Sequence, residues 1–463
     1  MVFINDAHGQ ISETQVHSVA TISCLEELQS TLKYCAESGL QISVAGGRHS
    51  LGRQPFITNG VVLDMRNFNQ VLGLEEASGI IRLQGGCMWP DVRQFLDLQE
   101  NTGARWEINQ KQTGADTLSV AGAISVNAHG NILCSGPISA DVAWIKLVTA
   151  DGCEVFCDRA QNRELFSLAI GGLGLFGVIC EIGLQLVPQT SFVRHAKETT
   201  IVDALDTWTK NDGRFCYGDM QLNIDSQSPS YLTRGILNLR EDTGDCRKPS
   251  SVQKADWNQL LALAHFEKRR AYEHYCAHAQ QVHGQIEIRD DFQWDFYEPN
   301  YHRQLEIEFG LERSSEVLAE FFIPFESAEQ LLSSARCTAK RMNIDLILAT
   351  LRSIKRCDIS YLRWARRDYL CLVLAIHTEH DHESLRNTDQ FCSALSQFCC
   401  DNGGTYYLPY RPFASSEQLR AAFPNFEEFA ELKTSYDPMH LLSSDWFEQM
   451  CEKTKQPLEG TYP

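Results

Sequence analysis

Apolar positions in the first part of the chain follow the period of a helix and then that of a strand. Residues 21–39 place leucines on one face, with Ser23 as the expected N-cap and Gly39 at the end, which predicts an amphipathic helix. The apolar run at 40–44 predicts a buried strand that leads into the loop 44–52. Further strands are expected at 61–65 and 80–84, followed by a helix from Pro90 to about Glu100.

A hairpin pattern and a glycine-rich stretch follow. Residues 142–148 and 154–157 alternate around the dipeptide at 151–152, Asp-Gly, which predicts a β-hairpin. Residues 172–177, Gly-Leu-Gly-Leu-Phe-Gly, have the letters of a dinucleotide-binding fingerprint. An apolar strand is expected at 178–187, where that fingerprint requires a helix to receive the pyrophosphate. A Rossmann-type site is therefore not expected.

Longer helical and strand patterns alternate beyond Pro188. Residues 255–283 predict the longest helix, with apolar positions near its start and a charged middle. Strand–helix–strand units of this kind favour one antiparallel sheet, so the whole chain is expected to be an α+β protein. The expected strands are 305–309, 321–324, 347–353 and 369–376, and the expected helices between them are 326–342 and 383–401.

Composition narrows the class of protein. A chain of 463 residues predicts two or three domains, and its net charge of −19 argues against nucleic acid or an anionic membrane as a partner. No apolar run is long enough for a membrane span, and the start lacks the pattern of a secretory signal. The 17 cysteines form no paired C-x-x-C sets, so no metal site is expected; buried free thiols favour the cytoplasm. Nothing in the pattern indicates an oligomeric state.

Two segments are candidates for ligand binding. In the loop 44–52, Gly46 and Gly47 allow a sharp turn whose amides can bind phosphate oxygens, and His49 would lie beside the bound group. A glycine turn next to an ordinary surface histidine is the alternative. Residues 114–133 contain almost no bulky side chain, which suits a backbone lying flush against a large flat ligand. A tightly packed crossing of two elements would require the same composition.

Six motifs together resemble a known family. In order they are Gly-Gly-Arg-His-Ser at 46–50, Asn-Gly-Val-Val-Leu-Asp-Met-Arg at 59–66, Leu-Gln-Gly-Gly-Cys-Met-Trp-Pro-Asp-Val at 83–92, Val-Ala-Gly-Ala-Ile-Ser-Val-Asn-Ala-His-Gly at 120–130, Leu-Val-Thr-Ala-Asp-Gly at 147–152 and Gly-Gly-Leu-Gly-Leu-Phe-Gly-Val-Ile at 171–179. Over roughly residues 15–190 their order and spacing resemble the FAD domain of the vanillyl-alcohol oxidase superfamily, also called the p-cresol methylhydroxylase superfamily. Its sugar-oxidising and decaprenylphosphoryl-ribose oxidase branches are the most similar, and weaker matches at 403–408 and 433–438 resemble the closing segment of the sugar branch.

The resemblance implies a domain organisation and a cofactor. It implies a two-subdomain FAD-binding domain at 1–190, a substrate (cap) domain with a mainly antiparallel sheet at 191–402, and a segment at 403–463 that returns to the FAD domain. It also implies that His49 is bonded covalently to the flavin, although Arg48 stands where many covalent members have glycine. The residues expected to bind FAD are Ala45, Gly46, Gly47, Arg48, His49, Ser50, Gly114, Thr117, Leu118, Gly122, Ser125, His129, Val178 and Ile179.

The catalytic residues implied by the resemblance come from the cap domain. Sugar-branch members carry a Glu-x-Arg pair on a cap strand; here Arg352 matches the arginine, and Thr350 replaces the glutamate. A structural arginine paired with an acidic neighbour is the alternative for Arg352. Tyr410 and Arg411 stand near the place of a flavin-side lysine and are candidates for orienting substrate.

The implied activity is oxidation of a CH–OH group in a sugar-like, polyol or lactone substrate. Hydride would pass to flavin N5 and then to dioxygen, giving hydrogen peroxide, or to another electron acceptor. One alternative is a dehydrogenase for an amine or a hydrophobic alcohol, like the cytokinin dehydrogenases. Another is a flavin-binding protein whose catalytic pair has decayed.

Overall fold

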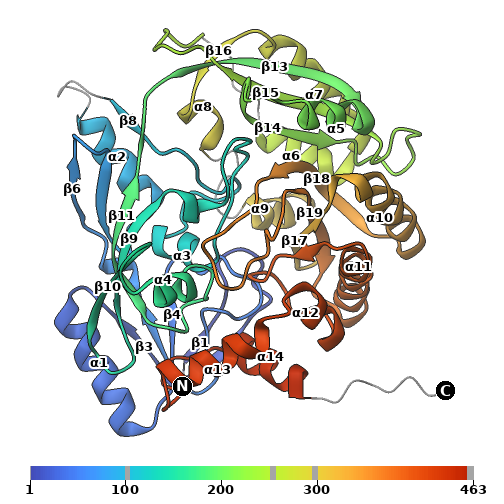
Figure 1. The fold of residues 1–463 in the computed structure, drawn as a ribbon. Coiled ribbons are helices and arrows are strands. Elements are labelled where there is room, and N and C mark those ends of the chain that lie inside the picture. Colours follow the sequence, from blue (N-terminus) through green and yellow to red (C-terminus); the bar gives the residue numbers. More distant parts are fainter. Residues whose placement is uncertain (1, 100–104, 251–256, 295–300, 456–463) are drawn as a thin grey trace.

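The computed structural model describes residues 2–99, 105–250, 257–294 and 301–455 (Figure 1). Its first half contains a three-stranded parallel sheet in the order β3-β5-β4, beside helix α1 (Leu25–Ser38). It also contains a five-stranded antiparallel sheet in the order β10-β9-β11-β7-β6. The strands are β3 (Ser18–Thr21), β4 (Ile42–Ala45), β5 (Val61–Asp64), β6 (Val71–Glu75), β7 (Ile80–Gln84), β9 (Val142–Val148), β10 (Glu154–Asp158) and β11 (Val178–Gln185).

Short elements complete this half. They are strands β1 (Val2–Ile4), β2 (Thr14–Val16), β8 (Trp106–Glu107) and β12 (Val187–Pro188), helices α2 (Trp89–Gln99), α3 (Val120–Ser125) and α4 (Arg163–Ala169), and the 3₁₀ turns η1 (Met65–Asn67) and η2 (Ile138–Ala140). Strand β11 begins directly after the glycine-rich stretch, so the prediction against a Rossmann site is confirmed. The predicted cap at Ser23 is wrong, because its backbone N–H and hydroxyl donate to the Glu27 carboxylate while Cys24 occupies the N-cap position.

The second half is built on an eight-stranded antiparallel sheet in the order β16-β13-β15-β14-β18-β19-β17-β20. Its central strands are almost wholly buried, because helices pack against the sheet and further helices line the far side of the large cavity that it borders. The strands are β13 (Ser191–Thr200), β14 (Phe215–Leu222), β15 (Arg234–Asp242), β16 (Ile286–Ile288), β17 (Ser314–Ile323), β18 (Asp345–Ile354), β19 (Tyr369–Glu379) and β20 (Thr405–Tyr406).

The helices of this half are α5 (Ile201–Thr209), α6 (Trp257–Phe266), α7 (Lys268–Val282), α8 (Asp290–Gln293), α9 (Tyr301–Phe309), η3 (Phe325–Ser327), α10 (Ala328–Met342), α11 (His382–Asp401), α12 (Ser416–Ala422), α13 (Phe426–Tyr436) and α14 (Asp445–Lys455). Two predictions are corrected. The helix predicted at 255–283 is interrupted at Glu267 between α6 and α7, and residues 255 and 256 lie outside the described part.

The strand predicted at 305–309 is helix α9 instead. Its letters alternate apolar and acidic, but Ile307 is 70% exposed whereas Glu306 is buried, so the alternation does not mark one buried face. His302 and Glu306 meet one helical turn apart, with Nδ1 and Oε1 separated by 3.6 Å. The side-chain contacts of a helix therefore override the strand-like pattern.

The end of the chain packs on the first half. Ile42 of β4 donates its N–H to the carbonyl of Leu441 at 2.7 Å, and Ser443 donates back to Ile42 at 2.8 Å. The C-terminal helices lie beside the first strands in Figure 1. This places residues 441–443 against the edge of the parallel sheet, while the exact domain limits stay predictions.

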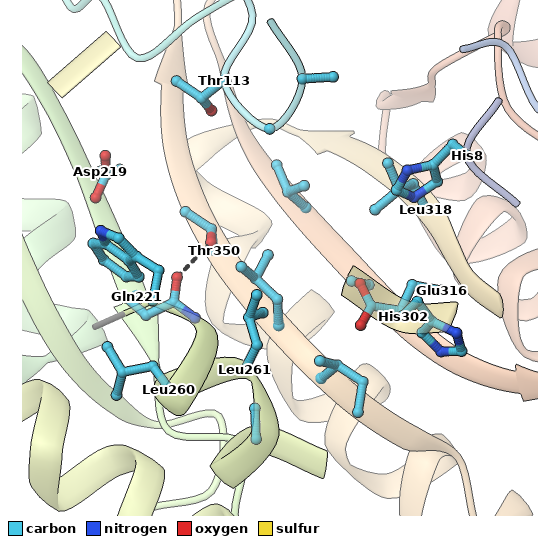
Figure 2. Close-up of a pocket in the computed structure, with 18 of the residues that line it drawn as sticks. His8, Thr113, Asp219, Gln221, Leu260, Leu261, His302, Glu316, Leu318 and Thr350 are labelled. Carbon is cyan, nitrogen blue, oxygen red and sulfur yellow. Dashed lines mark hydrogen bonds between the residues drawn. The ribbon is translucent and has the colours of Figure 1, made fainter. Parts of the chain in front are cut away.

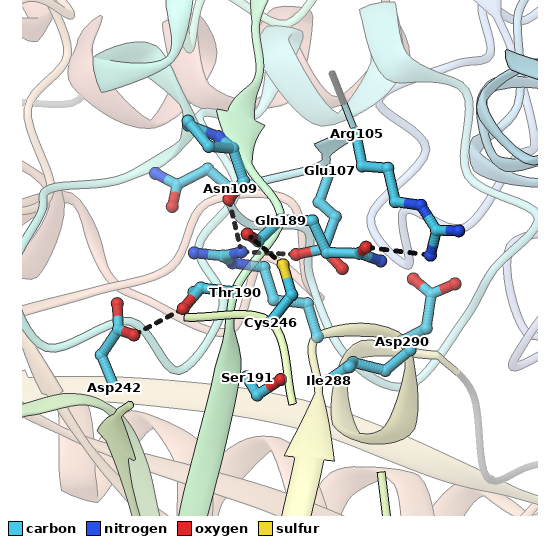
Figure 3. Close-up of polar contacts among 12 residues, drawn as sticks. Arg105, Glu107, Asn109, Gln189, Thr190, Ser191, Asp242, Cys246, Ile288 and Asp290 are labelled. Carbon is cyan, nitrogen blue, oxygen red and sulfur yellow. Dashed lines mark hydrogen bonds and ion pairs between the residues drawn. The ribbon is translucent and has the colours of Figure 1, made fainter. Parts of the chain in front are cut away.

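Polar contacts also join the two halves near β8. Arg289, which follows β16, donates to the buried carboxylate of Glu107 and, at 3.0 Å, to the hydroxyl of Tyr217. Gln293 donates to the carbonyl of Asn109 at 2.7 Å, and Figure 3 shows the group of polar side chains around Glu107 and Asn109. A buried ion pair therefore fixes the eight-stranded sheet against the first half.

Two expectations from the sequence concern the cysteines and possible membrane spans. All 17 cysteines have free thiols, as expected, but Cys134, Cys153, Cys246 and Cys337 are exposed rather than buried. Among the described residues, no helix combines the length and apolar character needed to cross a bilayer.

Candidate active site

Two glycine-rich loops meet backbone to backbone above β4. A Cβ atom on Gly47 would lie 2.2 Å from the carbonyl oxygen of Thr117, and one on Gly46 would lie 2.1 Å from Ser119 Oγ. Only glycine fits at such distances. Ser119 also caps α3, because its Oγ accepts the N–H of Gly122 at 3.1 Å. The two segments proposed as ligand-binding candidates thus form one structural unit.

His49 projects from this unit. Its Nε2 lies 3.0 Å from the hydroxyl of Thr117. Burial, with a smaller contribution from nearby His8, lowers the pKa of His49 to about 4. The imidazole is therefore neutral at physiological pH and retains a nucleophilic lone pair.

Arg48 has a backbone conformation that favours glycine. Its φ of 59° lies in the left-handed region, which costs a non-glycine residue about 1 kcal/mol or more. Its guanidinium lies 3.3 Å from the carboxylate of Asp64, which also accepts two hydrogen bonds from the Arg66 side chain. Attraction between Arg48 and Asp64 partly offsets the backbone strain.

Two cavities meet at this unit. The loop cavity, of about 200 Å³, lies among the segments 44–50, 112–129 and 173–179. The sheet cavity, of about 1040 Å³, lies over the eight-stranded sheet (Figure 2). His49, Glu320, Arg352 and Tyr410 line both, so the cavities adjoin at these residues.

Most residues expected to bind FAD line these cavities. Ala45 and Val178 do not: the first is buried in β4 and the second packs beneath α1, each within a separate apolar cluster. Thr117 lines the sheet cavity. The loop cavity is lined by Gly46, Gly47, Arg48, His49, Ser50, Gly114, Leu118, Gly122, Ser125, His129 and Ile179.

A buried carboxylate that the sequence analysis missed lies where the cavities adjoin. Glu320 on β17 accepts hydrogen bonds from His129 Nε2 at 2.6 Å and from the Tyr410 hydroxyl at 2.8 Å. His129 Nδ1 is 3.1 Å from the carbonyl of Gly130, so both ring nitrogens face oxygen atoms. Burial alone would raise the pKa of Glu320, but His129, Arg352 and Tyr410 together hold it below its usual value.

Strand register explains the place of Glu320. Val373 of β19 pairs with Glu320 on one side and with Thr350 on the other, and Thr350 also pairs with Gln221 of β14. These four residues form one row across four strands, and all of them line the sheet cavity. Position 350 lacks a carboxylate, but Glu320 supplies one from two strands away, at a distance of about 10 Å. An acidic residue within the mainly apolar segment 314–323 was the sequence feature that could have identified Glu320.

Arg352 and Thr350 occupy the wall of the sheet cavity. The Arg352 guanidinium donates to the hydroxyl of Thr113, while its buried Nε has no hydrogen-bond partner within the described part of the chain. A buried unpaired cationic donor is costly unless a ligand satisfies it. Thr350 donates to the side-chain carbonyl of Gln221 at 2.8 Å, which Figure 2 draws.

Two further candidates take other roles. Arg411 pairs with Asp389 through two contacts of 2.9 and 2.7 Å and does not line either cavity. Tyr410 remains a protonated donor, because burial and the charge of Glu320 raise its pKa well above its usual value.

His129, Glu320 and Cys371 are close enough to suggest a metal site, with ligand atoms within 4.8 Å of one another. Burial and the neighbouring Glu320 raise the pKa of Cys371 well above its ordinary value, so the thiol is protonated and donates at 3.5 Å to Glu320. This cluster is better described as a hydrogen-bond network.

Comparison with known proteins gives a matching family model and several relatives. Residues 17–158 match a family model described as an FAD binding domain. The chain is 33% identical over 171 residues to an uncharacterized oxidoreductase of the fasciation locus of Rhodococcoides fascians, covering 37% of each. It is 27% identical over 202 residues to L-gulonolactone oxidase of Bos taurus, covering 41% of this chain and 42% of that enzyme.

A longer alignment is more distant. The chain is 21% identical over 436 residues to L-gulono-1,4-lactone dehydrogenase of Mycobacterium tuberculosis, covering 91% of this chain and 92% of the relative. The chain spans about two fifths of the length of the first two relatives, 37% and 42%.

These matches define the class of the N-terminal part of the chain, which is an FAD-binding domain of an oxidoreductase type. Its motifs and relatives are similar to those of the vanillyl-alcohol oxidase superfamily of FAD-linked proteins.

Proposed function

We propose that the protein is an FAD-dependent oxidoreductase that oxidises a CH–OH group of a sugar-like, polyol or lactone substrate, with dioxygen as the electron acceptor. The observation that carries the proposal is the row Glu320–Val373–Thr350–Gln221 beside Arg352, which lines a cavity adjoining the FAD-binding loops. The aldonolactone enzymes among the relatives support the substrate class.

The two loops are proposed to hold FAD. Gly114 has a φ of 105° and no atom within 4 Å of an added Cβ, so its backbone is open for close approach. The buried, unpaired Nε of Arg352 offers the flavin or its substrate a charged donor. When bound, FAD supplies the N5 atom that accepts hydride.

His49 is proposed to attach the flavin covalently. Its neutral imidazole suits the role of nucleophile, and its Nε2 faces Thr117, which leaves Nδ1 for the bond. Acid precipitation should leave the flavin on the wild-type protein and release it from His49→Ala. His8→Ala alters a second histidine that lines both cavities and should retain the bound flavin. Yellow colour released by the wild type would contradict the covalent bond.

Arg352 and Glu320 are proposed as the catalytic residues. The fixed charge of Arg352 would stabilise negative charge that develops on the substrate oxygen. The Glu320 carboxylate, already bound by His129 and Tyr410, has a further acceptor position for the substrate hydroxyl and its proton. Thr350 and Gln221 would hold a second polar group of the substrate.

A second candidate follows from the apolar part of the cavity lining. Leu260 and Leu261 of α6 and Leu318 of β17 line the sheet cavity (Figure 2), and an apolar lining also suits a hydrophobic alcohol or an amine. The presence of Glu320 beside Arg352 speaks against the reading that the catalytic groups have decayed.

The test is anaerobic bleaching of the flavin by a panel of substrates. We expect aldonolactones, polyols or aldoses to reduce the flavin and apolar alcohols and amines not to do so. Reduction by the apolar group alone would favour the second candidate. Admission of air should then restore the yellow colour with release of hydrogen peroxide; reoxidation only by an artificial acceptor would reject dioxygen as the acceptor.

A further inference from the structure

A cluster of three histidines and a glutamate lies in the cap domain, away from the flavin loops. Glu316 on β17 pairs across the sheet with His377 of β19, while His265 comes from α6 and His302 from α9. The ring centroids of His265 lie 5.2 Å from those of His377 and 5.6 Å from those of His302. Four separate elements thus direct metal-ligating side chains to one place.

The cluster lies along the sheet from the proposed catalytic row. Glu316 and Glu320 are four residues apart on β17, so both side chains leave the same face about 13 Å from each other. His302 and Glu316 line the sheet cavity and are labelled together in Figure 2. The proposed hydride transfer does not use these groups, because they lie too far from the reacting end.

Distances within the cluster suit a metal ion. Ligand atoms of His265, His302 and Glu316 all lie within 4.8 Å of one another. His265 Nε2 and Glu316 Oε1 are 3.0 Å apart. Ligands of a tetrahedral zinc ion, with bonds of about 2.0–2.2 Å, are separated by roughly 3.3 Å, so small side-chain shifts would complete the site.

The surroundings of His302 orient it as a ligand. Its Nδ1 lies 3.6 Å from the carboxylate of Glu306, one turn along α9. Glu306 is itself fixed by Arg303 at 2.6 Å and by the N–H of Ser314 at 2.8 Å. A carboxylate at one ring nitrogen is the usual outer partner of a metal-binding histidine.

His377 packs beside the cluster, with its ring stacked on that of His302 and the two centroids 5.6 Å apart. The buried Nδ1 of His377 has no hydrogen-bond partner within the described part of the chain.

We propose that His265, His302 and Glu316 bind a divalent transition-metal ion of the zinc type, with His377 packed beside them. Two imidazoles and one carboxylate form a donor set that suits zinc better than magnesium or calcium, which prefer oxygen ligands. The ion would tie α6 and α9 to β17. Three protein ligands leave one position for a water or for an oxygen atom of a molecule in the sheet cavity.

The test uses full-length protein with its flavin. After treatment with a chelator, the protein should bind one equivalent of Zn²⁺, measured by metal analysis after dialysis. Co²⁺ should give the absorption of a tetrahedral ion in the red, where oxidised flavin is transparent. His302→Gln and Glu316→Gln should each weaken Zn²⁺ binding at least ~10-fold, since loss even of an outer partner of a ligand costs ~10–100-fold.

The matched control is His278→Gln. His278 also lines the sheet cavity, but it lies on α7 outside the cluster, so its loss should leave Zn²⁺ affinity unchanged. Should the cluster variants fail to fold, histidine modification of the wild type by diethyl pyrocarbonate remains: Zn²⁺ should protect His265 and His302 but not His278. Sub-stoichiometric Zn²⁺, unchanged affinity in His302→Gln, or modification insensitive to Zn²⁺ would each overturn the proposal.

Discussion

Glu320 and its hydrogen-bond partners lie at the buried end of the sheet cavity, where loss of a charge affects the stability of the fold. The carboxylate is 5% exposed and touches a histidine and a tyrosine, so removing its charge leaves His129 facing no anion. Loss of one member of a buried pair typically costs about 3–5 kcal/mol. We therefore expect Glu320→Gln to lower the free energy of unfolding by about that amount at pH 7.

The same substitution should change the dependence of stability on pH. Because the pKa of Glu320 is lower in the folded than in the unfolded chain, its contribution is complete above the unfolded value of about 4.3. It is lost as the pH falls through the folded value. Urea unfolding between pH 7 and pH 3 should thus show the difference between wild type and Glu320→Gln shrinking at the acid end. Glu326→Gln, at an exposed ion pair, should show little difference at any pH.

Arg352 should act on the reaction rather than on the fold. Arg352→Ala is expected to lower kcat/KM by about 10²–10³-fold, the usual cost of removing a donor to developing negative charge. It should also weaken the sulfite adduct of the flavin, which requires stabilisation of an anion. Arg352→Lys should recover only part of the activity, because a lysine lacks the planar fork.

The control for Arg352 is Arg356→Ala, beyond the end of the same strand, where the arginine pairs with exposed Asp358. Its kcat/KM and sulfite affinity should match the wild type. Equal loss of activity in both variants, with unchanged sulfite binding in Arg352→Ala, would show that the arginine supports the strand and not the flavin site.

Some residues of the site could be predicted from the sequence, and others could not. Residues such as Gly46, Gly122 and His49 could be predicted as loop-cavity residues, because a local motif carries them. Glu320 could not be found from the Glu-x-Arg spacing, because its relation to Thr350 is set by the order of β17, β19 and β18 in the sheet. The order of non-sequential strands depends on long-range packing, which a single local pattern does not encode.

At the scale of elements, a predicted helix or strand agrees with the structure when the apolar positions of the sequence are the ones that are buried. Strands β9, β11 and β19 were predicted within a few residues, because each is an apolar run buried in its sheet. Helix α9 was predicted as a strand, because five alternating letters cannot distinguish a strand from a short helix with a buried glutamate. Contacts with β17 decide between them.

A buried ion pair at the end of helix α13 connects the C-terminal segment to the first half. Lys433 is fully buried and pairs with Asp437 one turn later. Asp437 also accepts the N–H groups of Leu441 at 3.0 Å and Leu442 at 2.8 Å, which positions the segment that contacts β4. The ion pair thus turns the chain from the helix toward the parallel sheet.

We expect Lys433→Ala to lower the free energy of unfolding by about 3–5 kcal/mol, because Asp437 would be left buried without its cation. Glu431→Ala, at an exposed position of the same helix, should change it by less than about 0.5 kcal/mol. Chemical unfolding followed by circular dichroism measures both. A similar small effect in the two variants would mean that water reaches Asp437 once the lysine is removed.

At the scale of the whole molecule, the proposed site exists only where the loops of the first half face the cap sheet. Arg289 is 7% exposed and joins the halves through Glu107 and the carbonyl of Pro188 at 3.2 Å. Its loss would leave Glu107 buried beside no cation. Because burial already raises the pKa of Glu107 against the opposing effect of Arg289, the carboxyl would then tend to take up a proton.

Arg289→Ala should therefore uncouple the two halves as well as destabilise them. In the wild type, we expect flavin fluorescence and far-ultraviolet circular dichroism to report a single thermal transition. In Arg289→Ala the cap sheet should lose its fixed position first, so flavin exposure should precede loss of secondary structure. Arg105→Ala, an exposed neighbour that contacts Gln189 at 3.4 Å, should keep the transitions together. Coincident transitions in Arg289→Ala would mean that the apolar contacts between the halves suffice to hold the cap over the flavin loops.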